Sequence, residues 1–204
     1  STPKPSSAAS DVYKRQEEKA VLGQRCMQFI NKNEAIILDC STTARYIAKE
    51  IVRSGLKVSV ITNSLATAYE LSQSSAVRVI MLGGELDNNT GSFTGNTVLE
   101  ALERYHADKV FLSSAGISRE AGLTDYRQAE ADVRRKMIAQ SDQCYFVADA
   151  TKIGRHAMFT VGGVEKLTAL VAERPFDKQD PGLYRLLQRE RVDIVSCNFE
   201  QEEK

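Results

Sequence analysis

Short apolar runs alternate with helical repeats along most of this chain, and that alternation limits the possible folds more than any other feature. Most of the runs are continuous and do not alternate with polar residues, which is typical of strands buried on both faces. They predict strands at residues 35–38, 58–61, 77–82, 110–112, 145–148, 169–171 and 192–195. Helical spacing of apolar residues predicts helices at 43–53, 65–73, 97–105, 128–139 and 182–191. This order predicts an α/β fold with three layers, a mostly parallel sheet with helices on both faces.

Two segments depart from this alternation. Residues 1–16 are rich in Ser, Pro and Ala and show no apolar period, so we expect a linker, a tail or an expression remnant outside the fold. From Glu17 on, a further helix is marked on one face by Leu22, Cys26, Phe29 and Ile30. Residues 154–163 set a short apolar segment between glycines and predict a small extra strand element. We expect residues 17–204 to form one domain.

Charge and hydropathy exclude several classes of partner. The chain has 27 basic and 27 acidic residues, so it lacks the positive field that binding to a phosphate backbone requires. No apolar run approaches the roughly 20 residues of a membrane span, and the beginning of the chain lacks the apolar region of a signal peptide. We therefore expect a cytoplasmic protein that contacts neither nucleic acid nor a membrane through this segment.

Cysteine and histidine are too scattered to predict a metal site. The cysteines are Cys26, Cys40, Cys144 and Cys197, without a C-x-x-C pair, and the histidines are His106 and His156. This pattern favours reduced thiols, with no metal and no cofactor. Cys40 lies among small hydroxyl residues, where it is either a reactive thiol or a small buried filler.

The loop after the first predicted strand is the best candidate for an anion site. It contains Asp39, Ser41, Thr42 and Thr43 and runs directly into a predicted helix. The unpaired N–H groups and positive dipole end of a helix N-terminus favour a phosphate or a carboxylate. Ser and Thr are also common helix caps, so capping alone is the alternative.

Small polar residues also follow several other predicted strands. These residues are Thr62, Asn63 and Ser64, then Gly83 and Gly84, then Ser113, Ser114 and Gly116, and finally Asp149 and Lys152. Because the carboxyl ends of parallel strands meet at one edge of a sheet, we expect these loops to share one site for a ligand with hydroxyls and one anionic end. The alternative for each loop is a turn or a cap.

Three further features carry a possible role in binding. The segment 91–95, which ends at Gly95 before a predicted helix, is a second candidate phosphate cradle, although it is neither a P-loop nor a dinucleotide fingerprint. Glu130 is either partly buried or paired with Arg134 on a solvated helix face. Lys152 either reaches a ligand anion or pairs with Asp149.

Taken in order, these motifs, together with Gly122-Leu-Thr124, resemble the C-terminal effector-sensing domain of the DeoR family of bacterial transcriptional regulators over residues 17–175. The resemblance implies the isomerase/CoA-transferase-like fold shared with ribose-5-phosphate isomerase and glucosamine-6-phosphate deaminase. It also implies a ligand-binding set, which comprises Asp39, Ser41, Thr42, Thr43, Thr62, Asn63, Ser64, Gly83, Gly84, Gly95, Gly116, Glu130 and Lys152.

The same resemblance implies a regulatory function. The ligand would be a phosphorylated sugar or a related metabolite, and the chain would act as a homo-oligomer. The family's winged helix-turn-helix domain, expected before Glu17, is absent from the sequence, so DNA would be a partner only through that domain. The predicted helix at 17–30 adjoins the position of that domain and is our candidate for the element that a ligand moves.

A sugar-phosphate isomerase or deaminase is the alternative function. Isomerases of this fold abstract a proton next to a carbonyl and resemble one another in an acidic D-G-A-D-E loop. The corresponding stretch here, 113–117, has no carboxylate, although Glu120 and Asp125 in the following loop are possible substitutes. We therefore expect no catalytic residues and no enzyme activity. A pure oligomerisation module with a vestigial pocket is the third possibility.

Overall fold

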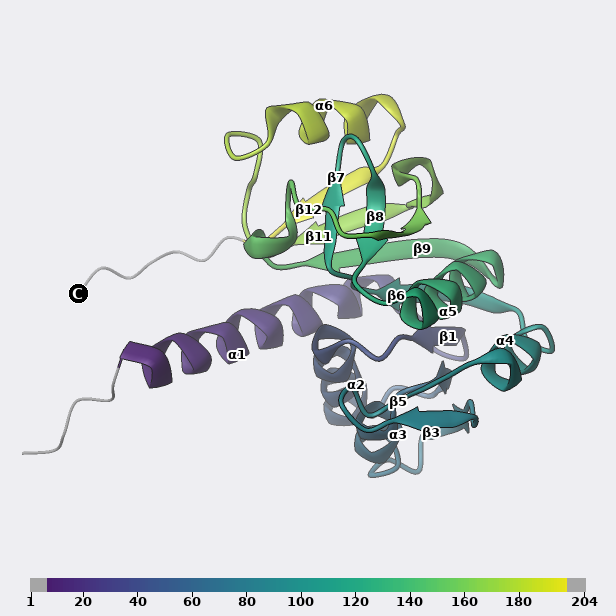
Figure 1. Cartoon of the computed structure of the whole chain (residues 1–204). Coiled ribbons are helices and arrows are strands. Elements are labelled where there is room, and N and C mark those ends of the chain that lie inside the picture. Colours follow the sequence, from purple (N-terminus) through teal and green to yellow (C-terminus); the bar gives the residue numbers. More distant parts are fainter. Residues whose placement is uncertain (1–6, 198–204) are drawn as a thin grey trace, which may run out of the picture.

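A seven-stranded parallel sheet forms the centre of the molecule in the computed structural model, which describes residues 7–197 (Figure 1). Its strands are β1 (Ala35–Leu38), β2 (Val58–Thr62), β3 (Val77–Met81), β6 (Ala107–Leu112), β9 (Ser141–Ala148), β11 (Ala169–Ala172) and β12 (Asp193–Ser196). They lie in the order β12-β11-β9-β6-β1-β2-β3, and every neighbouring pair is parallel. The predicted parallel sheet is confirmed, and β6 and β9 begin earlier than predicted.

Helices cover both faces of this sheet, as the apolar spacing predicts. They are α2 (Thr42–Ser54), α3 (Leu65–Leu71), α4 (Asn96–Leu102), α5 (Gln128–Ala139) and α6 (Pro181–Arg189), with short 3-10 turns at Ala150–Lys152 and Val164–Lys166. One core cluster joins α2 to the sheet through residues such as Ile47 and Ile51. The other joins α4, α5 and α6 to the opposite face through Val98, Met137 and Leu187. The three-layer fold is confirmed.

The helix α1 (Ser7–Cys26) starts ten residues before the predicted position and ends in a 3-10 turn at Met27–Phe29. The absence of an apolar period at 7–16 pointed to a linker, but this stretch contains strong helix formers such as Ala8 and Ala9. Each residue added to an existing helix gains a hydrogen bond without a new nucleation cost. Residues 7–16 are thus helical, while their assignment as a linker, a tail or an expression remnant stays a prediction, and 1–6 lie outside the described residues.

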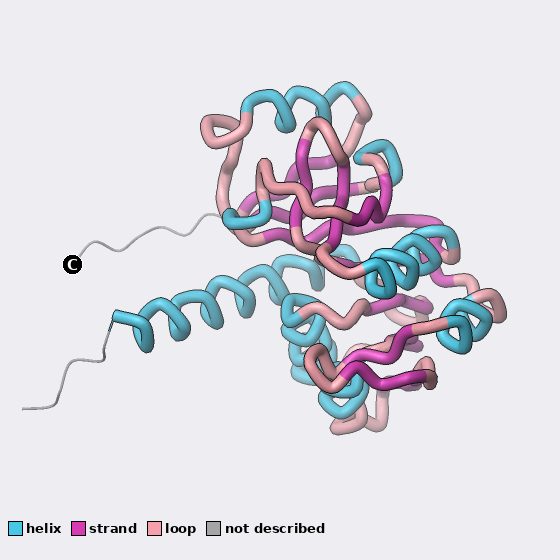
Figure 2. The backbone as a smooth tube through the Cα atoms, in the orientation of Figure 1, coloured by secondary structure: helices cyan, strands magenta, loops and turns pink. Residues whose placement is uncertain are grey.

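Two small antiparallel sheets accompany the main sheet (Figure 2). The first has three strands, β7 (Gly116–Ser118), β8 (Gly122–Asp125) and β10 (Phe159–Gly162). The second is the hairpin of β4 (Glu85–Asp87) and β5 (Ser92–Thr94). The strand β10 confirms the extra element predicted at 154–163. The other four strands have only three or four residues each, too short to produce a periodic signal.

The strand order reverses between β1 and β6. From β1 the chain moves outward to β2 and β3, then returns to β6 on the other side of β1 and moves outward through β9, β11 and β12. In open α/β sheets, ligands bind beyond the carboxyl ends of the strands at such a reversal. The loops after β1 and β6 therefore define where a site belongs. No helix within 7–197 has the length and apolar character needed to cross a membrane.

Candidate functional site

The register of the sheet brings the predicted loops together at one edge. Leu38 at the end of β1 pairs with Thr62 of β2 and with Phe111 of β6. Thr62 in turn pairs with Met81 of β3. On the other side, Leu112 pairs with Phe146 of β9. The segments that begin at Asp39, Asn63, Leu82, Ser113 and Asp149 therefore leave the sheet along one edge, as predicted.

Ser41 caps α2. Its Oγ accepts a hydrogen bond from the Ala44 N–H at 3.1 Å and donates one to Asp39 Oδ1 at 2.5 Å. The capping alternative is thus correct for the Ser41 side chain. The backbone N–H groups of Thr42 and Thr43, in the first turn of α2, have no hydrogen-bond partner within 7–197. Thr42 is exposed and Thr43 is buried, so it is at Thr42 that the positive end of the helix is open to an anion.

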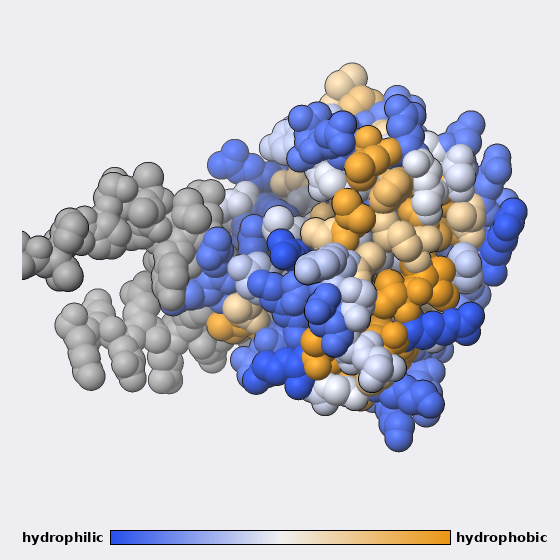
Figure 3. Space-filling view, turned by 90° about the horizontal axis from the view of Figure 1, so that it is seen from below, coloured by the Kyte–Doolittle hydropathy of each residue, from blue (hydrophilic) through white to orange (hydrophobic). Residues whose placement is uncertain are grey.

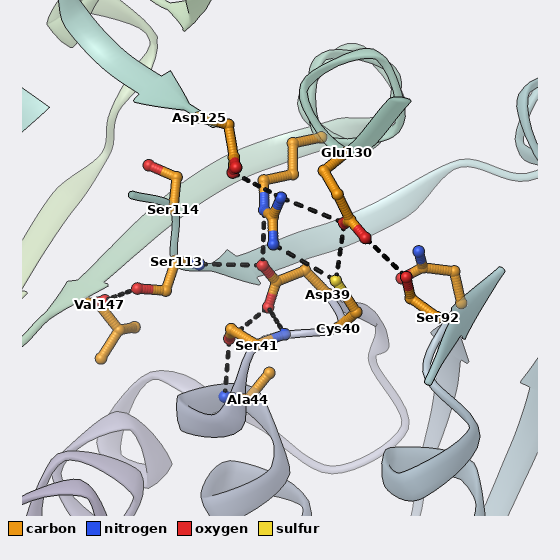
Figure 4. Close-up of polar contacts among 12 residues, drawn as sticks. Asp39, Cys40, Ser41, Ala44, Ser92, Ser113, Ser114, Asp125, Glu130 and Val147 are labelled. Carbon is orange, nitrogen blue, oxygen red and sulfur yellow. Dashed lines mark hydrogen bonds and ion pairs between the residues drawn. The ribbon is translucent and has the colours of Figure 1, made fainter. Parts of the chain in front are cut away.

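Arg134 lies at the centre of a buried polar network beside this loop. Figure 4 labels its partners Asp39, Cys40, Asp125 and Glu130. Its Nε donates to Asp39 Oδ2 at 2.9 Å, and its Nη1 donates to Asp125 Oδ2 at 2.7 Å and to Glu130 Oε2 at 3.3 Å. Its Nη2 donates to Cys40 Sγ at 3.3 Å. Burial opposes the charge, but the surrounding acidic groups, Asp39 foremost, hold the pKa of Arg134 above its usual value. One guanidinium thus joins the loop after β1, strand β8 and helix α5.

Glu130 belongs to this network and is only 4% exposed, so the solvated ion pair is the wrong alternative. Its Oε1 accepts a hydrogen bond from Ser92 Oγ at 2.6 Å, and its Oε2 accepts one from Cys40 Sγ at 2.9 Å. Burial raises the pKa of the Cys40 thiol; Arg134 opposes the rise, and Asp39 and Glu130 add to it. Cys40 is therefore neither an activated thiol nor a simple apolar filler, because it serves as a hydrogen-bond donor.

Asp39 connects the network to the neighbouring loop. Its Oδ2 accepts the backbone N–H of Ser113 at 3.1 Å, and its Oδ1 accepts the N–H of Ser41 at 3.1 Å. Both oxygens of Asp39 therefore have protein partners, as do both oxygens of Glu130. A ligand would contact either carboxylate in addition to these bonds or in place of one of them. Ligand contact by these two residues stays a prediction.

Lys152 turns toward the site and not toward Asp149. Its Nζ donates to Ser113 Oγ at 2.7 Å, and that hydroxyl donates to the Val147 carbonyl at 2.6 Å. Asp149 instead caps the 3-10 turn by accepting the Thr151 N–H at 3.0 Å. Burial lowers the pKa of Lys152, although Asp149 and Asp39 counteract this effect. The ammonium group thus lies partly desolvated beside the Asp39 loop.

Lys19 is a residue that the sequence analysis missed. It lies on α1, and its Nζ donates to Thr42 Oγ1 at 2.7 Å. The helix borders a recess at the carboxyl ends of β9 and β11, lined by Glu18, Lys19, Asp149, Thr151 and Glu173. The regular apolar spacing from Glu17 on was the only available signal, and it locates a helix without saying which sheet edge that helix borders.

The polar side chains of the loop after β2 mainly form hydrogen bonds with backbone groups. Thr62 Oγ1 accepts the Ser64 N–H at 3.1 Å, and Ser64 Oγ caps α3 by accepting the Thr67 N–H at 3.2 Å. Asn63 Nδ2 donates to the Phe93 carbonyl of the β4–β5 hairpin at 2.9 Å. The buried Asn63 Oδ1 has no partner in the described part of the chain. Asn63 therefore offers an unpaired acceptor at this strand end.

The predicted glycines have different surroundings. A Cβ on Gly84 would lie 2.9 Å from Val98 Cγ2, and one on Gly116 would lie 2.4 Å from the Arg155 carbonyl oxygen. Gly116 belongs to β7, so its absent side chain allows close backbone packing. Gly83 has open space around its Cα, and Gly95 precedes α4 with a φ of 89°. Ligand contact by these glycines stays a prediction.

The segment 91–95, the second candidate phosphate cradle, lies mostly in a strand. Ser92–Thr94 forms strand β5, and Ser92 Oγ points to Glu130. Backbone groups of β5 that a cradle would offer to a ligand form hydrogen bonds with β4 instead. The first loop, at 39–43, is thus the better anion candidate.

The possible substitute bases lie in two kinds of surroundings. Asp125 Oδ2 is bound by Arg134, and its Oδ1 accepts the Tyr126 N–H at 2.8 Å. Glu120 is exposed and pairs with Arg119. Within 7–197, no group of three or more His, Cys, Asp or Glu side chains is arranged to hold a metal ion.

Comparisons with known proteins agree with this architecture. Residues 14–174 match the model of the DeoR C terminal sensor domain. The uncharacterized HTH-type transcriptional regulator YulB of Bacillus subtilis is 31% identical over 88% of this chain and 67% of its own length. The transcriptional repressor GlcR of the same species is 33% identical over 78% of this chain and 60% of its own length. The chain thus spans about two thirds of the length of these relatives.

Solved structures show the same fold at low sequence identity. The eIF2B delta subunit of Chaetomium thermophilum matches 78% of this chain and 56% of its own, with 16% identity and a TM-score of 0.55. Ribose 5 phosphate isomerase A of Neisseria gonorrhoeae matches 67% of this chain and 53% of its own, with 15% identity and a TM-score of 0.50. At these identities the likeness concerns the fold alone.

Proposed function

The chain belongs to the family of DeoR C-terminal sensor domains, and on that premise we propose that it senses a phosphorylated sugar or a related metabolite for a bacterial transcriptional regulator. The ligand would bind at the carboxyl edge of the sheet, at the reversal between β1 and β6. Its binding would alter how the full-length regulator, through a separate DNA-binding domain, binds DNA. The relatives' names support a regulatory role, since both are described as HTH-type regulators or repressors.

One observation carries the proposal of an anionic ligand. The unpaired N–H groups of Thr42 and Thr43 lie in the first turn of α2, where Lys19 reaches the Thr42 hydroxyl, and Lys152 borders the same loop through Ser113. Helix N-termini and ammonium groups are the usual partners of a phosphate. The neutral groups nearby, including the unpaired Asn63 Oδ1, suit sugar hydroxyls. Charge for the phosphate and neutral polar groups for the sugar thus occur at one edge.

The proposed binding residues are those of the family pattern. They are Asp39, Ser41, Thr42, Thr43, Thr62, Asn63, Ser64, Gly83, Gly84, Gly95, Gly116, Glu130 and Lys152. Within this set we assign Asp39 and Glu130 mainly to holding the loops in place, because Arg134 and its neighbours already occupy their oxygens. We assign the phosphate to the start of α2 and to Lys152.

A sensor would bind its ligand without transforming it. In this proposal the chain is no enzyme, because the loop 113–117 contains no carboxylate and Arg134 engages the Asp39, Asp125 and Glu130 carboxylates. A carboxylate that already accepts hydrogen bonds from a guanidinium is not free to approach a proton of the substrate. Incubation with ribose 5-phosphate or a hexosamine 6-phosphate should therefore give no product. Turnover that Glu130→Gln abolishes would establish the isomerase or deaminase alternative instead.

We also propose that the protein acts in the cytoplasm as a homo-oligomer. Figure 3 shows hydrophobic side chains gathered on the face below β3 and the β4–β5 hairpin. Leu65 of α3 is 51% exposed and Leu86 of β4 is 37% exposed, and the Leu65 N–H donates to the carbonyl of Gly91 in the turn between β4 and β5. Exposed apolar patches on soluble proteins commonly mark protein–protein contacts. Because β3 is an edge strand of the main sheet, a second copy is a fitting partner for this face.

Ligand binding should raise the melting temperature of the chain. We expect at least one member of a panel of pentose and hexose phosphates to stabilise it, by about 2.7 kcal/mol at a ligand concentration of 100 times Kd. The matched unphosphorylated sugar should have little effect. Differential scanning fluorimetry measures both. A complete panel without a shift would contradict the proposal.

The variant Ser41→Asp serves as a sharper control in the same assay. Aspartate caps a helix as well as serine does, but it cannot donate to Asp39 as the Ser41 hydroxyl does, so circular dichroism of the ligand-free variant checks first that the fold is retained. The added negative charge next to the unpaired N–H groups should repel a phosphate and abolish the ligand-induced shift. An unchanged shift in this variant would show that the ligand binds elsewhere.

A further inference from the structure

Helix α1 is packed tightly against α2 through a glycine. A Cβ on Gly23 would lie 2.8 Å from the Tyr46 carbonyl carbon, so only glycine allows the two backbones to approach this closely. Lys19 lies four residues earlier, one helical turn away on the same face of α1. Figures 1 and 2 show that the later part of α1 adjoins α2, while its beginning extends beyond the sheet. The glycine contact therefore fixes where Lys19 reaches the loop.

The hydrogen bond from Lys19 to Thr42 joins a charged donor to a neutral acceptor. An ammonium group that donates to a neutral hydroxyl forms a weaker bond than one that donates to a phosphate or a carboxylate. Thr42 is itself exposed and lies in the first turn of α2, where its N–H group is open. An anion bound at this turn would lie close to the Lys19 ammonium group.

Lys152 provides a second positive charge close to the first. Burial is the main cause that lowers the pKa of Lys152, and the positive charges of Lys19 and Arg134 contribute in the same direction. The Asp149 and Asp39 carboxylates act in the opposite direction. Two ammonium groups that repel each other thus border one loop, and an anion between them would relieve the repulsion.

We propose that Lys19 contacts the anionic group of the effector and that this contact couples the site to helix α1. The inference rests on the proposed function, because it uses the same sheet-edge site. On binding, Lys19 would exchange its bond to Thr42 for a charge-assisted bond to the ligand. This exchange holds α1 more firmly against α2 and the sheet edge. A ligand can shift α1 only through such a difference between its bound and free contacts.

Because of thermodynamic linkage, this coupling can be measured both as ligand affinity and as stabilisation of α1. If Lys19 increases ligand affinity by holding the ligand to α1, the ligand must stabilise the docked position of α1 by the same factor. A purely structural bond between Lys19 and Thr42 makes no such link. In that case, loss of Lys19 would change the exchange of α1 amides equally with and without ligand.

Hydrogen–deuterium exchange of the whole 204-residue chain tests the inference, with ribose 5-phosphate and inorganic phosphate as probes. In the wild type, saturating probe should slow the exchange of amides in α1. Lys19→Gln should weaken probe binding, measured by calorimetry, about tenfold or more, since charge-assisted bonds are the strong ones. The same variant at saturating probe should lose the ligand-induced protection of α1.

Arg25→Gln is the matched control. Arg25 is an exposed cation on the same helix, but it lines a different recess beside Cys197. Its loss removes one charge from α1 and should leave affinity and protection unchanged. Equal affinity of wild type and Lys19→Gln would overturn the contact, and weaker binding with full α1 protection would overturn the coupling. Absence of binding by the wild type to these probes and to every pentose and hexose phosphate of the panel would overturn the proposed function together with this inference.

Discussion

Replacing Arg134 with methionine is expected to lower the free energy of unfolding by about 3–5 kcal/mol, the typical cost of leaving buried charges without their partner. Arg134 is 6% exposed and holds the carboxylates of Asp39, Asp125 and Glu130. Methionine is a flexible apolar side chain that fills irregular gaps, so the change removes mainly charge and hydrogen bonds. Urea denaturation measures the loss, provided that the slope with denaturant stays constant.

The neighbouring residue supplies the control for this prediction. Arg135 lies on the same helix and pairs with Asp132, but its side chain is 46% exposed. Arg135→Met should change the free energy of unfolding by less than about 1 kcal/mol, as for other surface ion pairs. Adding Asp125→Asn to Arg134→Met should recover part of the loss, because one unpaired charge disappears. A loss below about 1 kcal/mol for Arg134→Met would mean that the network relaxes without Arg134.

The network also explains why the candidate site has a defined shape before any ligand binds. Asp39 accepts from Arg134 on one side and from the Ser113 N–H on the other, so it holds the loops after β1 and β6 together. Glu130 extends this support to the β4–β5 hairpin through Ser92. A binding site held by such contacts loses little conformational entropy on binding. The acidic residues therefore serve an anion site indirectly, by positioning its loops.

The sheet and its loops were predictable from the sequence because most of its strands contain a short, largely apolar run. The helix at 128–139 even has the predicted bounds, since apolar residues mark it at both ends. A parallel sheet then necessarily gathers the strand-end loops at one edge. The sequence pattern could therefore locate the candidate site before any contact was known.

The partners of Arg134 were beyond the reach of spacing arguments. Glu130 at four residues' distance was a visible partner, but Asp39 and Asp125 come from other elements of the chain. Asp125 ends a four-residue strand, and strands this short give no periodic signal. Lys19 was missed for a related reason, because helical spacing does not reveal which edge of the sheet a helix borders. Tertiary packing alone determines these contacts.

Replacing Lys152 with methionine is expected to weaken sugar-phosphate binding by about 10- to 150-fold, which corresponds to the 1.5–3 kcal/mol of a hydrogen bond to a charged group. Among residues 7–197, Lys152 forms no ion pair and donates only to the neutral Ser113 hydroxyl, so its charge is available to a ligand. Isothermal titration calorimetry measures the change. Lys166→Met removes an exposed lysine elsewhere in the chain and should leave the affinity unchanged.

The pH dependence of binding tests the same role independently of the methionine variant. Burial holds the pKa of Lys152 below its usual value, and only the protonated ammonium attracts a phosphate. Affinity should therefore be highest below that pKa and fall as the pH rises through it. The fall should occur at a lower pH than it would for an ordinary exposed lysine. Lys152→Arg keeps its charge to higher pH and should move this fall upward. An identical alkaline fall in wild type and Lys152→Arg would assign it to another group, and wild-type affinity in Lys152→Met would remove Lys152 from the binding site.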